Sequence, residues 1–457
     1  MFAQPYSLNR KGKLSPAKTI VMGFLLVIII GTVCLSLPIA SKSNQGLGFV
    51  DSLFTATSAT CVTALSITTS TLDQFTMFGQ IVILLLIQIG GIGIMTVSTL
   101  LFLILGKRIG FQNRIMLQES YNQFSMAGIV KLAKYLIITT LCLEGIGALI
   151  LAIRFSFDMS LSQSVYYGIF HSISAFCNAG FNLLGHTPSA FINLGAYSSD
   201  YLVRTVIMLL IVLGGLGFPV IMELLRHKKS SAIKGSLHTK MVLIISAILI
   251  FTGAMSFFFL EYNNPATLGG MDMANKIFNS FFSSISFRTG GFGLGHVNVF
   301  NTATLYITML LMFIGASPSS TGGGIKTTTI GIILASVVST IRGYDETVIA
   351  KKRIPQETIN KGLIIISLSF TILFVSMLLL SLTENIGSLD ILFETISALS
   401  TTGLSTGVTH LLSNFGRILI AILMFVGRLG PVTVAGALSQ RNKVMPVHYA
   451  EEKIIIG

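Results

Sequence analysis

Four short segments of the chain can be aligned with one another, and each joins a helix-like stretch to a small-residue turn. A Ser begins every segment, and Gly ends three of the four. The segments are Ser58–Ala64, Ser174–Gly180, Ser284–Gly290 and Ser397–Gly403, at intervals of 116, 110 and 113 residues. The chain is therefore predicted to consist of about four copies of one unit.

The composition indicates that these units fold in a membrane. Hydrophobic residues make up 52% of the sequence, charged residues only 10%, and the mean hydropathy is +0.81. Apolar runs long enough to cross ~30 Å of hydrocarbon recur throughout, which predicts an all-α integral membrane protein. Eight such runs are expected, at residues 18–40, 77–105, 132–153, 200–225, 240–260, 302–340, 361–382 and 415–438.

The first run has an alternative interpretation as a signal peptide. Lys11 and Lys13 precede it, and the sequence Ser-Leu-Pro-Ile-Ala ending at Ala40 resembles a cleavage site. Its apolar stretch is too long for the hydrophobic region of a signal peptide, and it occupies the first place of a fourfold pattern. We interpret it as a retained helix.

Each unit is predicted to contain a long helix, a short re-entrant helix, a turn and a second long helix. Non-helical backbone persists in hydrocarbon only where it lines a wet cavity or is buried in protein. Four such turns around one axis would form a pseudo-fourfold, potassium-channel-like pore. The C-terminus of each short helix carries about half a negative charge, which favours a cation, and turn carbonyls can replace its hydration shell.

The unit boundaries follow from the segments and the apolar runs. The predicted units are 17–107 with pore loop 51–64, 130–226 with pore loop 165–180, 238–342 with pore loop 273–290 and a gate loop at 315–326, and 358–440 with pore loop 389–403. Residues 1–16 and 441–457 are predicted to be tails.

The formal net charge of +13 is explained by membrane topology. Lys and Arg gather at both ends and between the units, whereas Asp and Glu prevail on the other face of each unit. This bias predicts that both termini and the loops between units are cytoplasmic. Nucleic-acid binding is the alternative, but the basic residues are scattered over short loops rather than gathered on one face.

The glycine at the end of a segment can have either of two roles. Inward-pointing carbonyls need backbone angles that Gly reaches freely and other residues reach at a cost. Gly is also common in membrane helices for close packing, and this chain has 44 of them. Because Gly recurs at the same position in three of the four segments, we favour the first role, in which the turn carbonyls form an ion-selective filter.

A second repeated element lies in the last helix of each unit. It reads Ile89–Gly93, Leu213–Gly217, Ile314–Pro318 and Val426–Gly430. Small residues at these positions let helices approach closely. The third copy continues into ten residues without an apolar side chain other than Ala and Pro, which cannot all be helical, and the fourth places Arg428 at the register of Gly91, Gly215 and Ala316.

These departures motivate the hypothesis of a gate. The loop would obstruct the pore, and Arg428 would hold it there through its carbonyls, since an intramembrane Arg must face a cavity or a partner. The alternative is that Arg428 merely ties helices together. The predicted gate residues are Gly315, Ala316, Ser317, Pro318, Ser319, Ser320, Thr321, Gly322, Gly323, Gly324, Lys326 and Arg428.

Other chemistry has little support in the sequence. Gly322–Thr327 is not a phosphate-binding loop, because Ile325 splits the Gly-Lys step and no strand precedes it. Neither a catalytic triad nor ligand-type cysteine spacing occurs, so an enzyme, a zinc site, a disulfide framework and a covalently bound cofactor are not expected. His171 is expected to serve packing or a hydrogen bond, and Glu144, deep in a span, to pair with a neighbouring helix.

With these residues in view, the chain resembles the Ktr/Trk/HKT superfamily of potassium transporters, and most of all the ion-translocating membrane subunit of bacterial Ktr systems. The resemblance rests on the four loops, the Gly-rich stretch and Arg428, and it covers the chain from the first helix to the last. The filter residues it implies are Thr60, Cys61, Val62, Thr63, Ala64, Cys177, Asn178, Ala179, Gly180, Phe287, Arg288, Thr289, Gly290, Ser400, Thr401, Thr402 and Gly403.

The resemblance also implies a physiological setting. It implies potassium uptake across the plasma membrane, often promoted by sodium. The ion would pass backbone carbonyls of a filter whose glycines are Gly180, Gly290 and Gly403. The resemblance further implies a homodimer on a cytosolic ring of RCK-type regulatory subunits, which would bind the nucleotide in place of this chain.

Ala64 departs from the family pattern, which has Gly there. A methyl group restricts the backbone angles at this position. The alternative function is therefore a weakly selective sodium/potassium conduit. Arg288 is unusual beside a cation path, and its side chain is expected to point away from the axis, towards outer carboxylates or the back of the loop. The alternative from another functional class is an intramembrane enzyme or a receptor. It would need a group of polar residues shared by two helices, such as a Ser–His or an Asp pair, and the sequence shows none.

Overall fold

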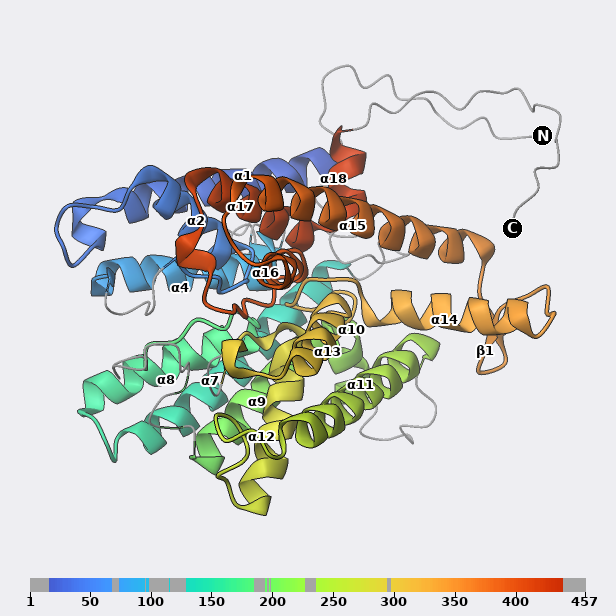
Figure 1. The fold of residues 1–457 in the computed structure, drawn as a ribbon, viewed down its shortest axis with the longest axis horizontal. Helices are drawn as coiled ribbons and strands as arrows, with labels where there is room; N and C mark the ends of the chain where they lie inside the picture. The colour runs from blue at the N-terminus through green and yellow to red at the C-terminus, as the bar shows by residue number, and fades with distance from the viewer. Residues whose placement is uncertain are drawn as a thin grey trace.

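The computed structural model describes residues 16–67, 74–94, 96–97, 115, 129–184, 194, 197, 199–226, 236–293 and 297–438. Within these residues the chain is almost entirely helical, and most long helices lie roughly along the longest axis of the molecule (Figure 1). A short antiparallel hairpin of β1 (Val348–Ile349) and β2 (Lys352–Arg353) follows α14. Single 3-10 turns are η1 (Pro38–Ala40), η5 (Val297–Val299) and η6 (Thr409–Leu411).

In four places a long helix is followed by a shorter one. The long helices are α1 (Pro16–Ser36), α7 (Ile129–Phe155), α11 (Leu237–Glu261) and α15 (Gln356–Thr383). The short helices are α2 (Phe49–Thr60), α8 (Leu161–Phe176), α12 (Met273–Ile285) and α16 (Ser388–Ser400). Each short helix packs against the long helix that precedes it.

A further helix or helix pair follows each short helix. These are α4 (Met77–Ile92), α9 (Tyr201–Leu216) with α10 (Phe218–Arg226), α13 (Thr302–Phe313) with α14 (Thr327–Ile341), and α17 (Asn414–Leu429) with α18 (Pro431–Leu438). The chain bends by 102° between α9 and α10 and by 98° between α17 and α18. Gly217 and Gly430 stand at these bends with φ of +89° and +85°, which Gly adopts without a side-chain penalty.

The helices close into a ring. α4 packs against α8, α9 against α12, α13 against α16, and α17 against α2. The helix that directly follows each short helix therefore contacts the short helix of the next set, and the last set contacts the first in the same way. Figure 1 shows this closure as the blue N-terminal helices lying beside the red C-terminal ones.

Four described helices are long and apolar enough to cross a membrane, at residues 17–36, 133–155, 237–261 and 356–383, and the two bent pairs bring the total to six. Their outer surfaces carry large apolar side chains that are more than half exposed, such as Leu26, Leu149, Phe251 and Phe374. Such faces are suited to contact with lipid. The chain is a membrane protein by these criteria.

The remaining predicted runs are not single helices. The run at 302–340 is divided into α13 and α14, because the Gly- and Ser-rich residues between them are not helical. The run at 77–105 is helical as α4 to Ile92, and most of its later residues lie outside the described part of the chain. The predicted tails 1–16 and 441–457 also lie outside it, except that Pro16 begins α1.

In three sets, a glycine lets the helix that follows the short helix approach the C-terminal end of that short helix closely. These are the first glycines of the repeated element, Gly90, Gly214 and Gly427. A Cβ added at these positions would overlap a backbone carbonyl oxygen, that of Thr60, Phe176 and Leu399 respectively. The close-packing role expected for these glycines is confirmed, and it places bare helix backbone against the C-termini of α2, α8 and α16.

We predict that Gly90→Ala destabilises the fold by about 1–3 kcal/mol, because the new methyl group must displace the Thr60 carbonyl. The measurement is thermal unfolding of the purified protein in detergent. Gly145→Ala in α7 is the matched control, since no atom lies within 4 Å of a Cβ there. Equal melting temperatures for the two variants would contradict this account of the helix contact.

Candidate functional site

The short helices α2, α8 and α16 end in the same tight turn. Its turning residues are in the left-handed region, with φ of +58° at Val62, +58° at Asn178 and +52° at Thr401. The next residue donates its N–H to a serine carbonyl five positions earlier: Thr63 to Ser58 (2.8 Å), Ala179 to Ser174 (2.7 Å) and Thr402 to Ser397 (3.0 Å). This hydrogen bond closes a helix end that carries a left-handed residue, so the chain turns back sharply.

A second left-handed residue follows two positions later in each of these turns. It is Ala64 with φ of +67°, Gly180 with +72° and Gly403 with +85°. A left-handed conformation costs an L-residue with a Cβ roughly 1–2 kcal/mol, whereas Gly adopts it freely. Ala64 therefore keeps the backbone shape of the glycine loops at an energetic cost.

The third loop differs from the other three, and it corrects one assignment. Helix α12 continues through a π-helical turn, Ser286–Gly290, and the left-handed residue is Gly291, with φ of +70°. The alignment had put Gly290 in this position, and that was wrong by one residue. The wider π turn uses an additional residue before the chain reverses.

A sequence signal for the correct register was present. A large apolar residue directly follows each left-handed position, namely Leu65, Phe181, Phe292 and Leu404, and all four are buried. Alignment on this residue instead of on the preceding Ser would have selected Gly291.

The four loops meet at one place inside the ring. A Cβ built on Gly180 would lie 2.8 Å from the Cα of Gly291, and one built on Gly291 would lie 2.6 Å from the carbonyl oxygen of Thr402. A Cβ on Gly403 would lie 2.9 Å from the Cβ of Ala64. Backbone rather than side chains therefore fills the space between neighbouring loops.

The predicted filter residues all lie at these helix ends and are buried, except Ala64 and Gly403, which are half-buried. Loops two and three are also joined by side chains. In the orientation that satisfies its amide, Asn178 accepts a hydrogen bond from the Thr289 hydroxyl (2.7 Å) and donates to the carbonyl of Ile211 (3.1 Å). This network fixes the second and third loops to each other.

The Arg288 side chain lies on the far side of the third loop. Its Nη2 is 3.5 Å from the hydroxyl of Ser246 on α11 and 3.4 Å from the carbonyl oxygen of Gly315. No carboxylate pairs with it among the described residues, so the expected link to outer carboxylates was wrong. Its contacts lead to the back of the loop, which was the other expected direction.

The predicted gate loop is non-helical and packs below the four loops. Ala316 donates to the carbonyl of Gly323 (3.2 Å), which folds the stretch onto itself. The N–H groups of Ser317 and Thr321 donate to the end of α9, at the carbonyls of Gly215 (3.0 Å) and Gly214 (3.2 Å).

The gate loop contacts three of the four loops directly, the third through its Gly315 carbonyl oxygen, which lies 3.4 Å from Nη2 of Arg288. The Thr321 hydroxyl donates to the carbonyl of Phe176, the last residue of α8 (3.1 Å). The N–H of Gly323 donates to the hydroxyl of Thr401 (3.0 Å). The Lys326 ammonium turns back to the carbonyl of Gly322 (2.7 Å). The gate loop is therefore held by hydrogen bonds to the second and fourth loops and by the Arg288 contact with the third.

Arg428 connects three elements from the last turn of α17. Its guanidinium donates to the carbonyl oxygens of Thr321 in the gate loop and of Gly90 and Gly91 at the end of α4, the last at 3.1 Å. These contacts fit both roles considered for Arg428, because it holds the gate loop and ties two helices together.

Two buried polar side chains of the second set have structural partners. Glu144 accepts a hydrogen bond from the Gln88 amide on α4 (2.9 Å), so its expected pairing with a neighbouring helix is confirmed. Its other oxygen lies 3.7 Å from the sulfur of Cys177. The His171 ring lies between the carbonyl of Tyr167 (2.8 Å) and the N–H of Leu183 (3.2 Å), in agreement with the hydrogen-bonding role expected for it.

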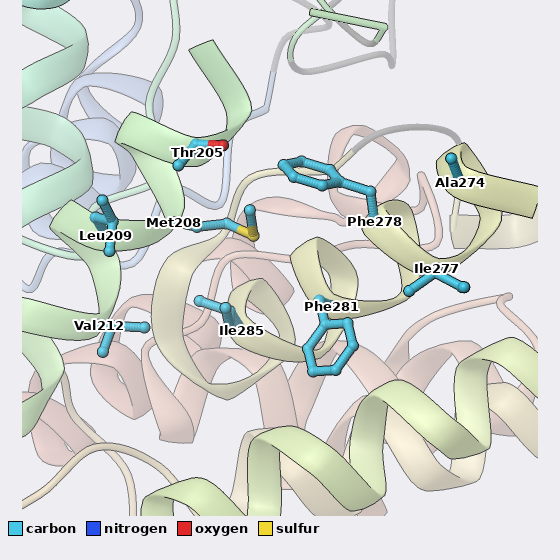
Figure 2. Close-up of a pocket in the computed structure, with 9 residues that line it drawn as sticks. All are labelled: Thr205, Met208, Leu209, Val212, Ala274, Ile277, Phe278, Phe281 and Ile285. Carbon is cyan, nitrogen blue, oxygen red and sulfur yellow. The ribbon is translucent and has the colours of Figure 1, made fainter. Parts of the chain in front are cut away.

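A groove between α9 and α12 has an apolar lining that is not suited to a cation. Its volume is about 460 Å³, and Figure 2 shows its lining. The lining residues are Thr205, Met208, Leu209, Val212, Ala274, Ile277, Phe278, Phe281 and Ile285. A single hydroxyl and no charged group face it. Across the described residues, no group of three or more His, Cys, Asp or Glu could hold a metal ion.

Comparison with known proteins defines the class of this protein. Residues 14–446 match the TrkH family model, described as cation transport protein. The chain is 40% identical over 445 residues to the Ktr system potassium uptake protein B of Bacillus subtilis (strain 168), covering 97% of each chain. It is 36% identical over 451 residues to the potassium/sodium uptake protein NtpJ of Enterococcus hirae, covering 97% of this chain and 98% of the relative.

The fold has a solved counterpart. The crystal structure of the potassium transporter TrkH from Vibrio parahaemolyticus matches with a TM-score of 0.69, covering 95% of this chain and 87% of that one at 18% identity. The helical ring thus has the fold of that structure, and the matched family and relatives are transport proteins rather than enzymes. The chain belongs to the TrkH family of cation transport proteins.

Proposed function

We propose that the protein takes up potassium across the bacterial plasma membrane as the ion-translocating subunit of a Ktr-type system. One observation carries this proposal, the meeting of four backbone turns at the C-terminal ends of four short helices. The four sets of helices are then repeats around a central pore. Relatives named as potassium uptake proteins, matched over nearly the full chain, support the same assignment.

The filter would act through its backbone. The C-terminal dipoles of α2, α8, α12 and α16 favour a cation where the four loops meet. Carbonyl oxygens of the turns would replace the water that the ion sheds. The filter residues are those expected from the sequence, with Gly291 in the place first given to Gly290.

The gate loop would close the path below the filter. It lies between the ends of α8 and α16, and its position depends on hydrogen bonds with Thr401 and Arg428. Conduction would require these bonds to break or the loop to shift. Arg428 would thus stabilise the closed arrangement, and its positive charge would add a barrier to cations.

Ala64 favours the alternative of a weakly selective sodium/potassium conduit. Its methyl group stands 2.9 Å from the place where a Cβ of Gly403 would be, in a loop that is strained relative to its neighbours. The relative NtpJ, named as a potassium/sodium uptake protein, is consistent with sodium passing through this architecture.

The wider assembly is proposed from the family. We propose a homodimer on a cytosolic ring of RCK-type subunits that bind the regulatory nucleotide, with both termini cytoplasmic and uptake promoted by sodium. The relatives named as parts of a Ktr system support a partner subunit.

One prediction concerns selectivity. In cells that lack their own potassium uptake and co-express a Ktr-type regulatory subunit, the unmodified protein should restore growth at low potassium. Ala64→Gly should increase the ratio of potassium to sodium uptake about tenfold, which corresponds to ~1.4 kcal/mol, because Gly lets the first-loop carbonyls take the orientation of those in the glycine loops. Potassium and sodium uptake are measured side by side by ion-selective assays.

Two results would contradict this proposal. Absence of any potassium uptake at normal membrane levels of the protein would argue against the function itself. An unchanged uptake ratio in Ala64→Gly would argue that the first loop does not set selectivity.

Another prediction concerns the gate. Arg428→Gln should raise potassium uptake in the absence of the regulatory subunit about tenfold, because hydrogen bonds to a charged group contribute about 1.5–3 kcal/mol. Arg417→Gln is the matched control on the same helix, since Arg417 pairs with Asp51 and does not contact the gate loop. Equal uptake by both variants would contradict the gating role and show that Arg428 only connects neighbouring helices.

A further inference from the structure

The end of each short helix carries a buried serine, which lies six residues before the left-handed residue in the first, second and fourth loops and five residues before it in the third. These serines are Ser58, Ser174, Ser286 and Ser397, and all four are fully buried. The backbone carbonyl of each accepts a hydrogen bond from the residue five positions later, including Gly291 to Ser286 (3.3 Å) in the π turn. The four positions can therefore be compared within one molecule, although their loops differ in sequence.

In three loops the serine hydroxyl braces the chain that leaves the filter. Ser174 donates to the carbonyl of Phe181 (2.6 Å), and Ser286 donates to the carbonyl of Phe292 (2.5 Å). Ser397 instead accepts a hydrogen bond from the N–H of Gly403 (3.1 Å). Each bond joins the last turn of the short helix to the left-handed residue or to the residue after it. The braces thus hold the backbone whose carbonyls face neighbouring loops.

The first loop lacks this brace. The Ser58 hydroxyl is buried and has no hydrogen-bond partner in the described part of the chain. The same holds there for the hydroxyls of Thr60 and Thr63, on either side of the turn. The first loop also contains two L-residues in the left-handed region, Val62 and Ala64, and Val is especially unfavourable there because it is β-branched.

We propose that Ser174, Ser286 and Ser397 are positioning residues for ion selectivity, and that the unbraced first loop is the compliant part of the filter through which sodium is admitted. This inference rests on the proposed function and deepens it. The serines do not contact the ion in this account. They limit how far the carbonyls of three loops can move towards a smaller ion, whereas the carbonyls of the first loop can follow it.

The physical reason is the difference in size between the two ions. Discrimination by carbonyls depends on the dimensions of the cage or on the number and field of its oxygens, and both change when one wall moves. A single brace contributes modestly to stability, as other neutral hydrogen bonds do. Its removal should therefore affect selectivity more clearly than folding.

The test compares four single substitutions, Ser58→Ala, Ser174→Ala, Ser286→Ala and Ser397→Ala, in the full-length protein. The readout is the ratio of potassium to sodium uptake in cells that co-express a Ktr-type regulatory subunit, together with the melting temperature of each purified variant. Removing a brace should lower the ratio about three- to tenfold while potassium uptake continues. Ser58→Ala, which breaks no hydrogen bond, should keep the ratio of the unmodified protein.

A merely structural role for the serines predicts a different result. The three braced variants would then melt earlier and transport less of both ions at an unchanged ratio, which would overturn the proposal. A loss of selectivity in Ser58→Ala as large as in the other three would overturn it as well. If an alanine variant fails to fold, the Thr variant at that position keeps the hydroxyl and should restore the ratio, whereas Val of similar shape should not. Absence of all cation uptake by the unmodified protein would instead contradict the proposed function.

Discussion

The left-handed turn at the end of each short helix is the constraint on which the rest of the site depends. It reverses the chain at once, so that four helix C-termini and four stretches of backbone arrive at one place. Neighbouring loops approach so closely there that a Cβ has no room at Gly180, Gly291 or Gly403, which explains these three glycines. Ala64 keeps the same shape at a cost, so the ring of turns is complete but has one weaker member.

The helices around this ring are arranged to keep the turns in place. Gly90, Gly214 and Gly427 let the following helices lie directly on the carbonyls at the ends of the short helices. The ends of α4 and α9 then offer their own carbonyls to Arg428 and to the N–H groups of the gate loop. The same glycine-rich helix ends thus contact the four loops and also hold the proposed gate loop, so the two parts share one support.

The sequence predicts the membrane setting, the short helices and the Gly-rich stretch well, because each depends on local composition and spacing. Alignment on the serines does not predict the register of the third loop, since the π turn at Ser286–Gly290 adds a residue, whereas the large apolar residue after the turn, Phe292, does indicate it. The sequence also does not predict that Arg428 reaches Gly90 and Gly91, because that contact exists only when the last helix closes on the first set.

The central claim is that backbone carbonyls of four unequal loops bind a dehydrated potassium ion. The most direct measurement is a crystal structure of the protein soaked with rubidium or thallium, recorded at the absorption edge of that ion. The account predicts an anomalous peak on the axis enclosed by Ala64, Gly180, Gly291 and Gly403, above the gate loop. A protein that transports potassium but shows its ordered ions only elsewhere, with none between these four loops, would contradict it.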